Sequence, residues 1–206
     1  MVASLPAGVQ APSRREQILA TAAGLFAERG YGGVSIDDLG SARGVSGPAL
    51  YWHFPGKEAV LEEVIDSVAE TRLAMGVRCF ADGGTSLSVL DRLVRAHLTL
   101  VSERNPFVLV YSRDAAHLSE TARKRVERSH ELYVEVWVMA LAKQTPSATT
   151  EDLRAIVAAV HRMLDAVCQI TATPLEPATL HLICAVARRA LLAAAATPGR
   201  RKGRAS

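Results

Sequence analysis

Residues 44–54 read GVSGPALYWHF, and this stretch decides how the first quarter of the chain folds. Ser46 is a helix cap, and Pro48 follows in the first turn, where a missing N–H costs nothing. Ser35 begins another cap signature ahead of it, and Gly44 lies in the turn between the two short helices. This arrangement is the helix-turn-helix pattern, whose second helix can enter the major groove of DNA.

Working outward, almost all periodicity in the chain is helical, so we predict an all-α fold of about nine helices. The first helix should begin at Ser13, which forms a capping-box pattern with Glu16, and a long helix should begin near Lys57. Ile36, Leu39, Val45, Leu50 and Phe26 are the predicted core of the first unit. The later helices are expected at about 86–104, 107–115, 119–143, 151–171 and 177–195.

A change of character near residue 56 predicts two helical parts: a three-helix head and a larger C-terminal helical body. We expect the head at 13–56 and the body at 57–197. Residues 1–12 are expected to form a flexible arm, and residues 198–206 a basic, disordered tail.

The distribution of charged residues along the chain says more about DNA binding than the net charge does. The 206 residues include 24 Lys and Arg against 21 Asp and Glu, a formal net charge of +3. Four of these basic residues lie within 200–204, so the remaining chain has one more acidic residue than basic ones. If the protein binds DNA, it must therefore do so with a few placed charges.

The sequence argues against membrane and secreted proteins. It contains no apolar run of about 18 residues and no secretory signal at the N-terminus. Cys79, Cys168 and Cys184 are widely spaced, which indicates free thiols in a reducing compartment. The basic tail could attract a membrane, but four charges are too few for firm anchoring. We expect a cytoplasmic protein with no membrane partner.

Catalytic motifs are absent as well. The sequence has no nucleophile elbow, no phosphate-binding loop and no dinucleotide fingerprint. His130 and Glu131 begin like H-E-x-x-H, but Val134 breaks that zinc motif. His161 and Asp165 lie four residues apart and are expected to form an ordinary hydrogen bond on one helix. We therefore expect no enzyme, no cofactor and no metal site.

The stretch 44–54, followed by Lys57-Glu58-Ala59, closely resembles the TetR family of transcriptional repressors. The preceding helix, with Ile18-Leu19 and the run LFAERGY at 25–31, resembles it too, so the resemblance spans about residues 13–65. It implies a dimer that binds a palindromic DNA operator and responds to a small effector held in the C-terminal body.

The resemblance and the side-chain chemistry together give a predicted DNA-binding set. Polar tips on Tyr51 and His53, and the charge of Lys57 at a helix start, are suited to phosphate oxygens. Positions 46–49 and Trp52 would face or flank the bases. The predicted set is Arg14, Arg15, Ser35, Arg43, Ser46, Gly47, Pro48, Ala49, Tyr51, Trp52, His53 and Lys57.

Residues 46–54 contain no Arg, Lys, Asn or Gln, the usual bidentate partners of guanine and adenine. We therefore predict readout by apolar contact of Pro48 and Ala49 with thymine methyls, together with Tyr51 and Arg43. Sequence-dependent DNA shape would supply the remainder. Two residues keep a second interpretation, since Trp52 could be a packing residue and His53 could simply cap its helix.

In the body, aromatic and flexible residues suggest an apolar pocket, although their spacing also suits a plain core. The candidate pocket residues are Phe107, Val110, Tyr111, Tyr133, Trp137 and Met163. With few amides in the chain, a hydrophobic ligand of the acyl or acyl-CoA type is favoured. Apolar stripes on the last two helices predict the dimer interface, or packing inside the monomer: Leu153, Ile156, Val160, Leu164, Val167, Leu180, Ile183, Ala187 and Leu191.

The function that fits these features is a dimeric, ligand-responsive repressor. The competing hypotheses are a packed helical hairpin with no DNA role, and a helical ligand-binding or enzymatic protein in which the helix-turn-helix is vestigial. Removing Tyr51, His53 and Lys57 together with Arg14 and Arg15 should abolish DNA binding in the first case and be neutral in the others.

Overall fold

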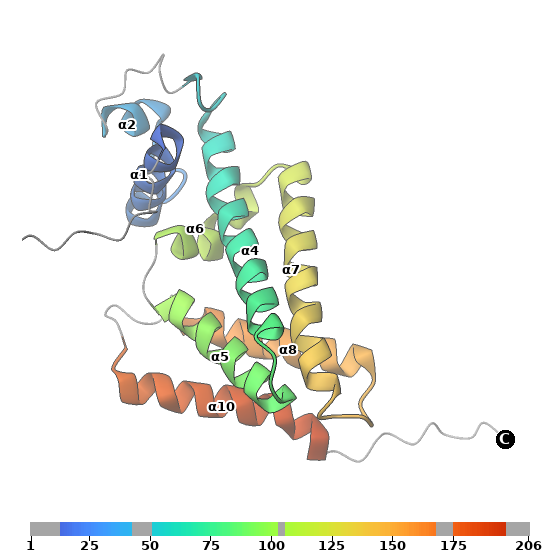
Figure 1. Cartoon of the computed structure of the whole chain (residues 1–206). Helices are drawn as coiled ribbons and strands as arrows, with labels where there is room; N and C mark the ends of the chain where they lie inside the picture. Colours follow the sequence, from blue (N-terminus) through green and yellow to red (C-terminus); the bar gives the residue numbers. More distant parts are fainter. Residues whose placement is uncertain (1–12, 43–50, 103–105, 168–174, 197–206) are drawn as a thin grey trace, which may run out of the picture.

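The computed structural model describes residues 13–42, 51–102, 106–167 and 175–196 (Figure 1). These residues form α-helices and one short 3-10 helix, with no β-strand among them, which confirms the predicted all-α class. The helices are α1 (Arg14–Arg29), α2 (Ile36–Ser41), α4 (Lys57–Ala81), α5 (Ser86–Ser102), α6 (Pro106–Asp114), α7 (Glu120–Ala142), α8 (Thr150–Asp165) and α10 (Pro177–Ala196), with η1 (Ala115–His117). None of the helices in these ranges is both long and apolar enough to cross a membrane.

Helix starts follow the cap residues that the sequence offers. In α1 the Ser13 amide donates to Glu16 Oε2 at 2.6 Å, and the Glu16 amide donates back to Ser13 Oγ at 3.2 Å. The predicted capping box is therefore present. Helix α8 departs from prediction at its other end, since it ends at Asp165 rather than near 171. The predicted arm (1–12) and tail (198–206) lie outside the described residues.

Two hydrophobic cores organise the chain. The first joins α1 and α2 to the N-terminal half of α4, with Phe26 and Leu39 buried as predicted and Ile36 packed at its edge. It also takes in Val110 of α6 and Val126 of α7, so it continues past residue 57, where the sequence places the domain boundary. Val45 and Leu50, the other predicted members, lie outside the described residues.

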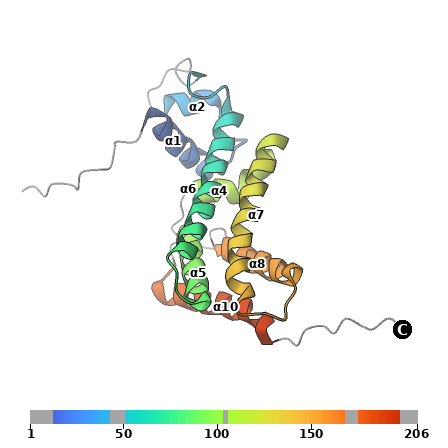
Figure 2. The same ribbon diagram turned by 45° about the vertical axis from the view of Figure 1, so that its right-hand side comes forward.

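The second core lies between α4, α5, α7, α8 and α10. Helices α4 and α7 run side by side in both views (Figures 1 and 2). Gly76 makes their close approach possible, because a Cβ atom there would lie 2.8 Å from the Tyr133 ring. A side chain at position 76 would therefore push the two helices apart.

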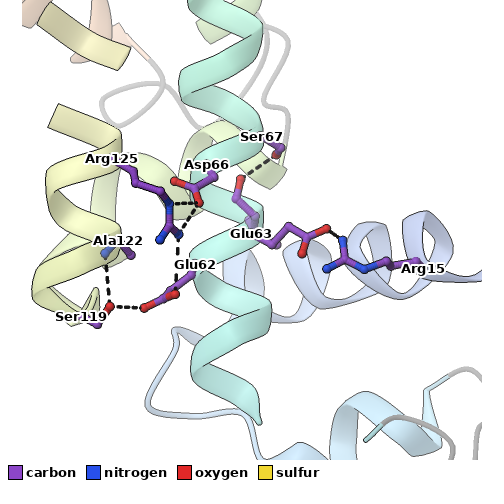
Figure 3. Close-up of polar contacts among 9 residues, drawn as sticks. Arg15, Glu62, Glu63, Asp66, Ser67, Ser119, Ala122 and Arg125 are labelled. Carbon is purple, nitrogen blue, oxygen red and sulfur yellow. Dashed lines mark hydrogen bonds and ion pairs between the residues drawn. The ribbon is translucent and has the colours of Figure 1, made fainter. Parts of the chain in front are cut away.

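Polar contacts hold α4 to its neighbours at the head end of the molecule (Figure 3). Arg125 of α7 donates to Asp66 Oδ2 through Nη2 at 2.6 Å and Nε at 3.1 Å. Ser119, the N-cap of α7, donates to Glu62. Helix α6 holds the other side of the head, since Arg113 donates to the carbonyl oxygens of Phe26 and Ala27 at the end of α1. The head is thus fixed to the body through α4 and α6 together.

The stripes predicted for the dimer surface require a correction. Of these nine residues, Ile156, Leu180 and Ile183 are partly buried, and the others are buried in the core of a single chain: Leu153, Val160, Leu164, Val167, Ala187 and Leu191. Helices α8 and α10 pack against each other and against the rest of the body through these stripes. Periodicity identified the apolar face of each helix correctly but could not identify what covers it. For the six buried residues, the alternative of packing inside the monomer is confirmed.

Candidate functional site

The turn before α4 presents three side chains at the head end of the molecule. Trp52 is 89% exposed and Tyr51 is 53% exposed, and His53 is exposed as well. The next residue, Phe54, is buried in the first core. Phe54 therefore anchors the turn while its three neighbours face solvent. The interpretation of Trp52 as a packing residue within the subunit is wrong.

Lys57 has partners inside the subunit that the sequence did not reveal. Its Nζ donates to the carbonyl oxygens of Val34 at 2.8 Å and Tyr31 at 2.9 Å, and lies 4.2 Å from the centre of the Tyr31 ring. The side chain thereby ties the loop between α1 and α2 to the start of α4. An ammonium group has three hydrogens, so one remains beyond these two bonds.

The two arginines at the start of α1 lie in different settings. Arg14 is exposed, whereas Arg15 pairs with Glu63 of α4 (Figure 3) and stacks over Phe54, 4.7 Å from the ring centre. The charge of Arg15 is therefore partly neutralised within the subunit, and that of Arg14 is the more accessible of the two.

Ser35 is exposed but already engaged. Its hydroxyl donates to Asp38 Oδ2 at 2.6 Å and accepts from the Asp38 amide at 3.1 Å, which caps α2. The remaining predicted DNA-binding residues lie outside the described residues: Arg43, Ser46, Gly47, Pro48 and Ala49. The DNA-contact roles of the whole set stay predictions.

A second candidate site lies inside the body, where α4, α5, α7 and α8 meet. We call it the polar cluster, and its members are Arg72, His97, His130, Tyr133, Trp137, His161 and Asp165. All are buried or partly buried, and Arg72, His97 and His161 are at most 2% exposed.

The bonds in the polar cluster centre on Asp165. Arg72 donates to it through Nη2 at 2.5 Å and Nη1 at 3.4 Å, and His97 Nε2 lies 3.0 Å from Oδ1. His97 Nδ1 in turn lies 3.0 Å from the Tyr133 hydroxyl. His161, four residues before Asp165, has no hydrogen-bond partner at either ring nitrogen. The hydrogen bond predicted for His161 is therefore wrong, because side chains from α4 and α5 meet Asp165 instead.

Burial sets the ionisation of this cluster. Burial lowers the pKa of His97 despite its bond to Asp165, and burial lowers the pKa of His161 well below its usual 6.5. For Asp165, burial alone would raise the pKa, but the His97 bond and the Arg72 charge together hold it well below its usual range. The histidines are therefore neutral near pH 7, and the charges of Arg72 and Asp165 balance.

The structure separates the predicted pocket residues. Tyr133 and Trp137 are buried in the polar cluster, and Met163 packs against the same core. The Arg72 guanidinium stacks over Tyr111, with its Cζ atom 4.7 Å from the centre of the tyrosine ring. Val110 faces the first core, and Phe107 packs against both cores. A groove of about 220 Å³ elsewhere in the body, between α5 and α10, is lined by other residues, including Arg95, Leu98 and His181.

The sequence did contain a sign of the polar cluster. Arg72 falls on the apolar face of α4, between Val68 and Gly76, and His97 falls on that of α5 beside Leu93. Lys, Arg and His at such core positions are unusual unless they are paired. Because no pairing can be read from one sequence, the dispersed histidines gave no reason to join them.

Comparisons with known proteins match this architecture. The family profile described as bacterial regulatory proteins, tetR family, matches residues 18–64. The transcriptional repressor KstR2 of Rhodococcus jostii is 29% identical over 131 residues, which cover 62% of this chain and 63% of that protein. The regulator EthR of Mycobacterium tuberculosis is 45% identical over 71 residues, 32% of this chain and 33% of EthR.

The solved structure of the TetR-family regulator PfmR from Thermus thermophilus has a TM-score of 0.74 and 25% identity. The match between the two structures covers 85% of this chain and 97% of PfmR. The matches to these KstR2 and EthR proteins span less than two thirds of their length.

An all-helical body behind an N-terminal helix-turn-helix head defines a class of DNA-binding regulators. Within that class, residues 18–64 match the tetR family of bacterial regulatory proteins, and the described fold is similar to that of a TetR-family regulator.

The polar cluster predicts how stability depends on pH. Unfolding restores the usual pKa of each buried histidine, so below about pH 6.5 the unfolded state binds more protons than the folded one. The free energy of unfolding should therefore be highest above pH 7. It should fall on acidification, by up to about 1.4 kcal/mol per pH unit for each histidine. Urea unfolding between pH 7.5 and 5.5 measures this, and His161→Phe should flatten the dependence. An equally steep dependence in that variant would contradict the assignment.

Proposed function

We propose that this chain is a repressor that binds a palindromic DNA operator as a homodimer and is released by a small, largely apolar ligand in its helical body. On this proposal the protein is not an enzyme, and the polar cluster belongs to the ligand site. The proposal extends to the whole chain what the family match supports for the head.

The observation that carries the DNA-binding part is the exposed turn of Tyr51, Trp52 and His53. Trp52, 89% exposed, and its neighbour Tyr51, 53% exposed, together present aromatic surface that an external partner would cover. Phe54 is buried behind the turn, and the same region lies within the match to the tetR profile at residues 18–64. A duplex would supply phosphates for Tyr51 and His53 and an apolar base edge for Trp52.

The cations around this turn have unequal roles in the proposal. Arg14, exposed at the start of α1, is the stronger candidate for a phosphate contact. Lys57 offers its third hydrogen while the other two hold the loop, so it both shapes the head and approaches the backbone. Arg15 would contribute less, because Glu63 already pairs with it.

Single substitutions test the DNA-binding surface. Tyr51→Phe removes one hydroxyl and keeps the ring, and Arg14→Ala removes one exposed charge. Each should weaken binding to an operator selected from random duplexes by about tenfold or more, because a hydrogen bond to a charged group contributes roughly 1.5–3 kcal/mol. Fluorescence anisotropy at fixed salt measures the affinity.

Arg78→Ala is the matched control, since this exposed arginine lies in the last turn of α4, at the opposite end from the head. If Tyr51→Phe and Arg14→Ala bound DNA as well as Arg78→Ala does, the surface would be wrongly placed. The vestigial helix-turn-helix would then be the better hypothesis.

The ligand part of the proposal is supported by the composition of the body core. Most of its residues are aliphatic or aromatic, which favours an acyl or acyl-CoA compound as the effector class. A rise in melting temperature with decanoyl-CoA tests this class. A rise with glucose and similar polar metabolites, and none with decanoyl-CoA, would sink it.

The dimer surface is proposed on the outward faces of α8 and α10, opposite the buried stripes. Leu182 is 65% exposed and Val186 is 47% exposed, one turn apart on α10. The exposed residues of α8 include the small side chains Ala155, Ala158 and Ala159, which permit close helix approach. Two such helix pairs would form a four-helix interface and match the two-fold symmetry of a palindrome.

A charge at the centre of that surface tests the dimer. Val186→Arg should convert the protein to monomers in sedimentation velocity, because pairing would bury an unpaired guanidinium. Val77→Arg on α4 is the control, since that valine is 52% exposed on another helix and should leave the dimer intact. Equal behaviour of the two variants would show that the interface lies elsewhere.

A further inference from the structure

The polar cluster holds an unusual set of buried polar atoms. Buried side-chain nitrogens that lack a hydrogen-bond partner in the described part of the chain include Arg72 Nε, His130 Nδ1 and both ring nitrogens of His161. All of them belong to this one cluster. The rest of the described core contains no such atom.

Leaving these atoms unpaired is costly, because each loses its hydrogen bonds to water on burial. His161 is the clearest case, since it is 2% exposed and a neutral imidazole offers one donor and one acceptor. A side chain such as Phe would fill the same space without that cost. The nitrogens are therefore available to a hydrogen-bonding group that enters the cluster.

We propose that the polar cluster recognises an uncharged hydrogen-bonding group, such as a carbonyl, amide or hydroxyl, in a flat and otherwise apolar part of the ligand. The proposal rests on the proposed function in identifying this ligand with the effector. It adds the chemical class of the group that reaches the cluster.

The absence of net charge in the cluster favours an uncharged group. Arg72 is already paired with Asp165 at 2.5 Å, so its charge is compensated before any ligand arrives. The neighbouring histidines are neutral near pH 7. A carboxylate brought to this site would be a buried charge without a counter-ion, which is far more costly than a neutral amide.

The walls of the cluster favour a flat group. The His161 ring lies nearly parallel to the Tyr133 and His97 rings, with centres 5.1 Å apart in both pairs, and Trp137 meets it edge-on at 4.6 Å. A planar ligand can take up the stacking that these rings now make with one another. The groove between α5 and α10 is a weaker candidate, because its lining includes exposed charged residues and no buried unpaired nitrogen.

Three compounds of similar shape test the inference by isothermal titration calorimetry on the full chain: 2-naphthamide, 2-naphthoate and 2-methylnaphthalene. The amide should bind about fivefold more tightly than the hydrocarbon, because one neutral hydrogen bond contributes roughly that factor. The carboxylate should bind about tenfold more weakly than the amide. His161→Phe should remove the preference for the amide over the hydrocarbon, whereas His181→Phe, at an exposed histidine of α10, should keep it.

His161→Gln provides a second variant in case the phenylalanine variant does not fold, and its amide should restore part of the preference. Equal binding of the amide and the hydrocarbon, or no binding of any of the three compounds, would overturn the proposal. The partner of these nitrogens would then be ordered water. An unchanged preference in His161→Phe would overturn it as well. Calorimetry needs no operator, so amide binding that fails to release DNA would count against the proposed function and not against this site.

Discussion

Helix α4 belongs to both hydrophobic cores, and this continuous element, supported by α6, sets the arrangement of the head relative to the body. Val60, Leu61, Val64, Ile65 and Ala69 pack in the first core, and Val68 and Cys79 pack in the second. Over 25 residues the helix is about 37 Å long, since each residue adds about 1.5 Å. A shift of α4 in the body must therefore move the side chains that support the exposed turn.

The polar contacts of α4 likewise run from the head to the body. Glu63 meets Arg15 of α1, Asp66 meets Arg125 of α7, and Arg72 meets Asp165 of α8. Helix α6 gives a second connection, because Tyr111 lies under Arg72 while Arg113, two residues further, holds the end of α1. A ligand in the polar cluster would thus touch both supports of the head. Contact geometry alone does not measure coupling, which requires a change in DNA affinity.

The helix starts could be predicted from the sequence because the residues that cap each helix lie close together in the chain. Ser13 with Glu16 and Ser35 with Asp38 form their capping boxes within four residues, so the starts of α1 and α2 were predictable. The family resemblance, and not a local pattern, directed attention to residues 51–53, and it left open whether Trp52 packs within the subunit. The internal partners of Lys57 could not be predicted, because Tyr31 and Val34 come close only once α1, α2 and α4 have packed.

The polar cluster lay beyond prediction for a related reason. Arg72 and Asp165 are 93 residues apart, and nothing in either local sequence indicates that they pair. The buried stripes of α8 and α10 show the same limit, since Leu164 and Leu191 are apolar whether a partner subunit or the same chain covers them. Local patterns determine which face of a helix is apolar, whereas tertiary packing determines what that face meets.

On the proposed function, a chain with little net charge binds DNA through a few placed cations in each of two heads. The salt dependence of affinity for a palindromic operator tests this proposal most directly, because each phosphate contact releases counter-ions. Arg14, Arg43 and Lys57 in both subunits, with or without Arg15, would neutralise about six to eight phosphates and give a log–log slope of about −5 to −7. A slope near −2 would mean that most of these cations are not at the DNA, and would contradict the account.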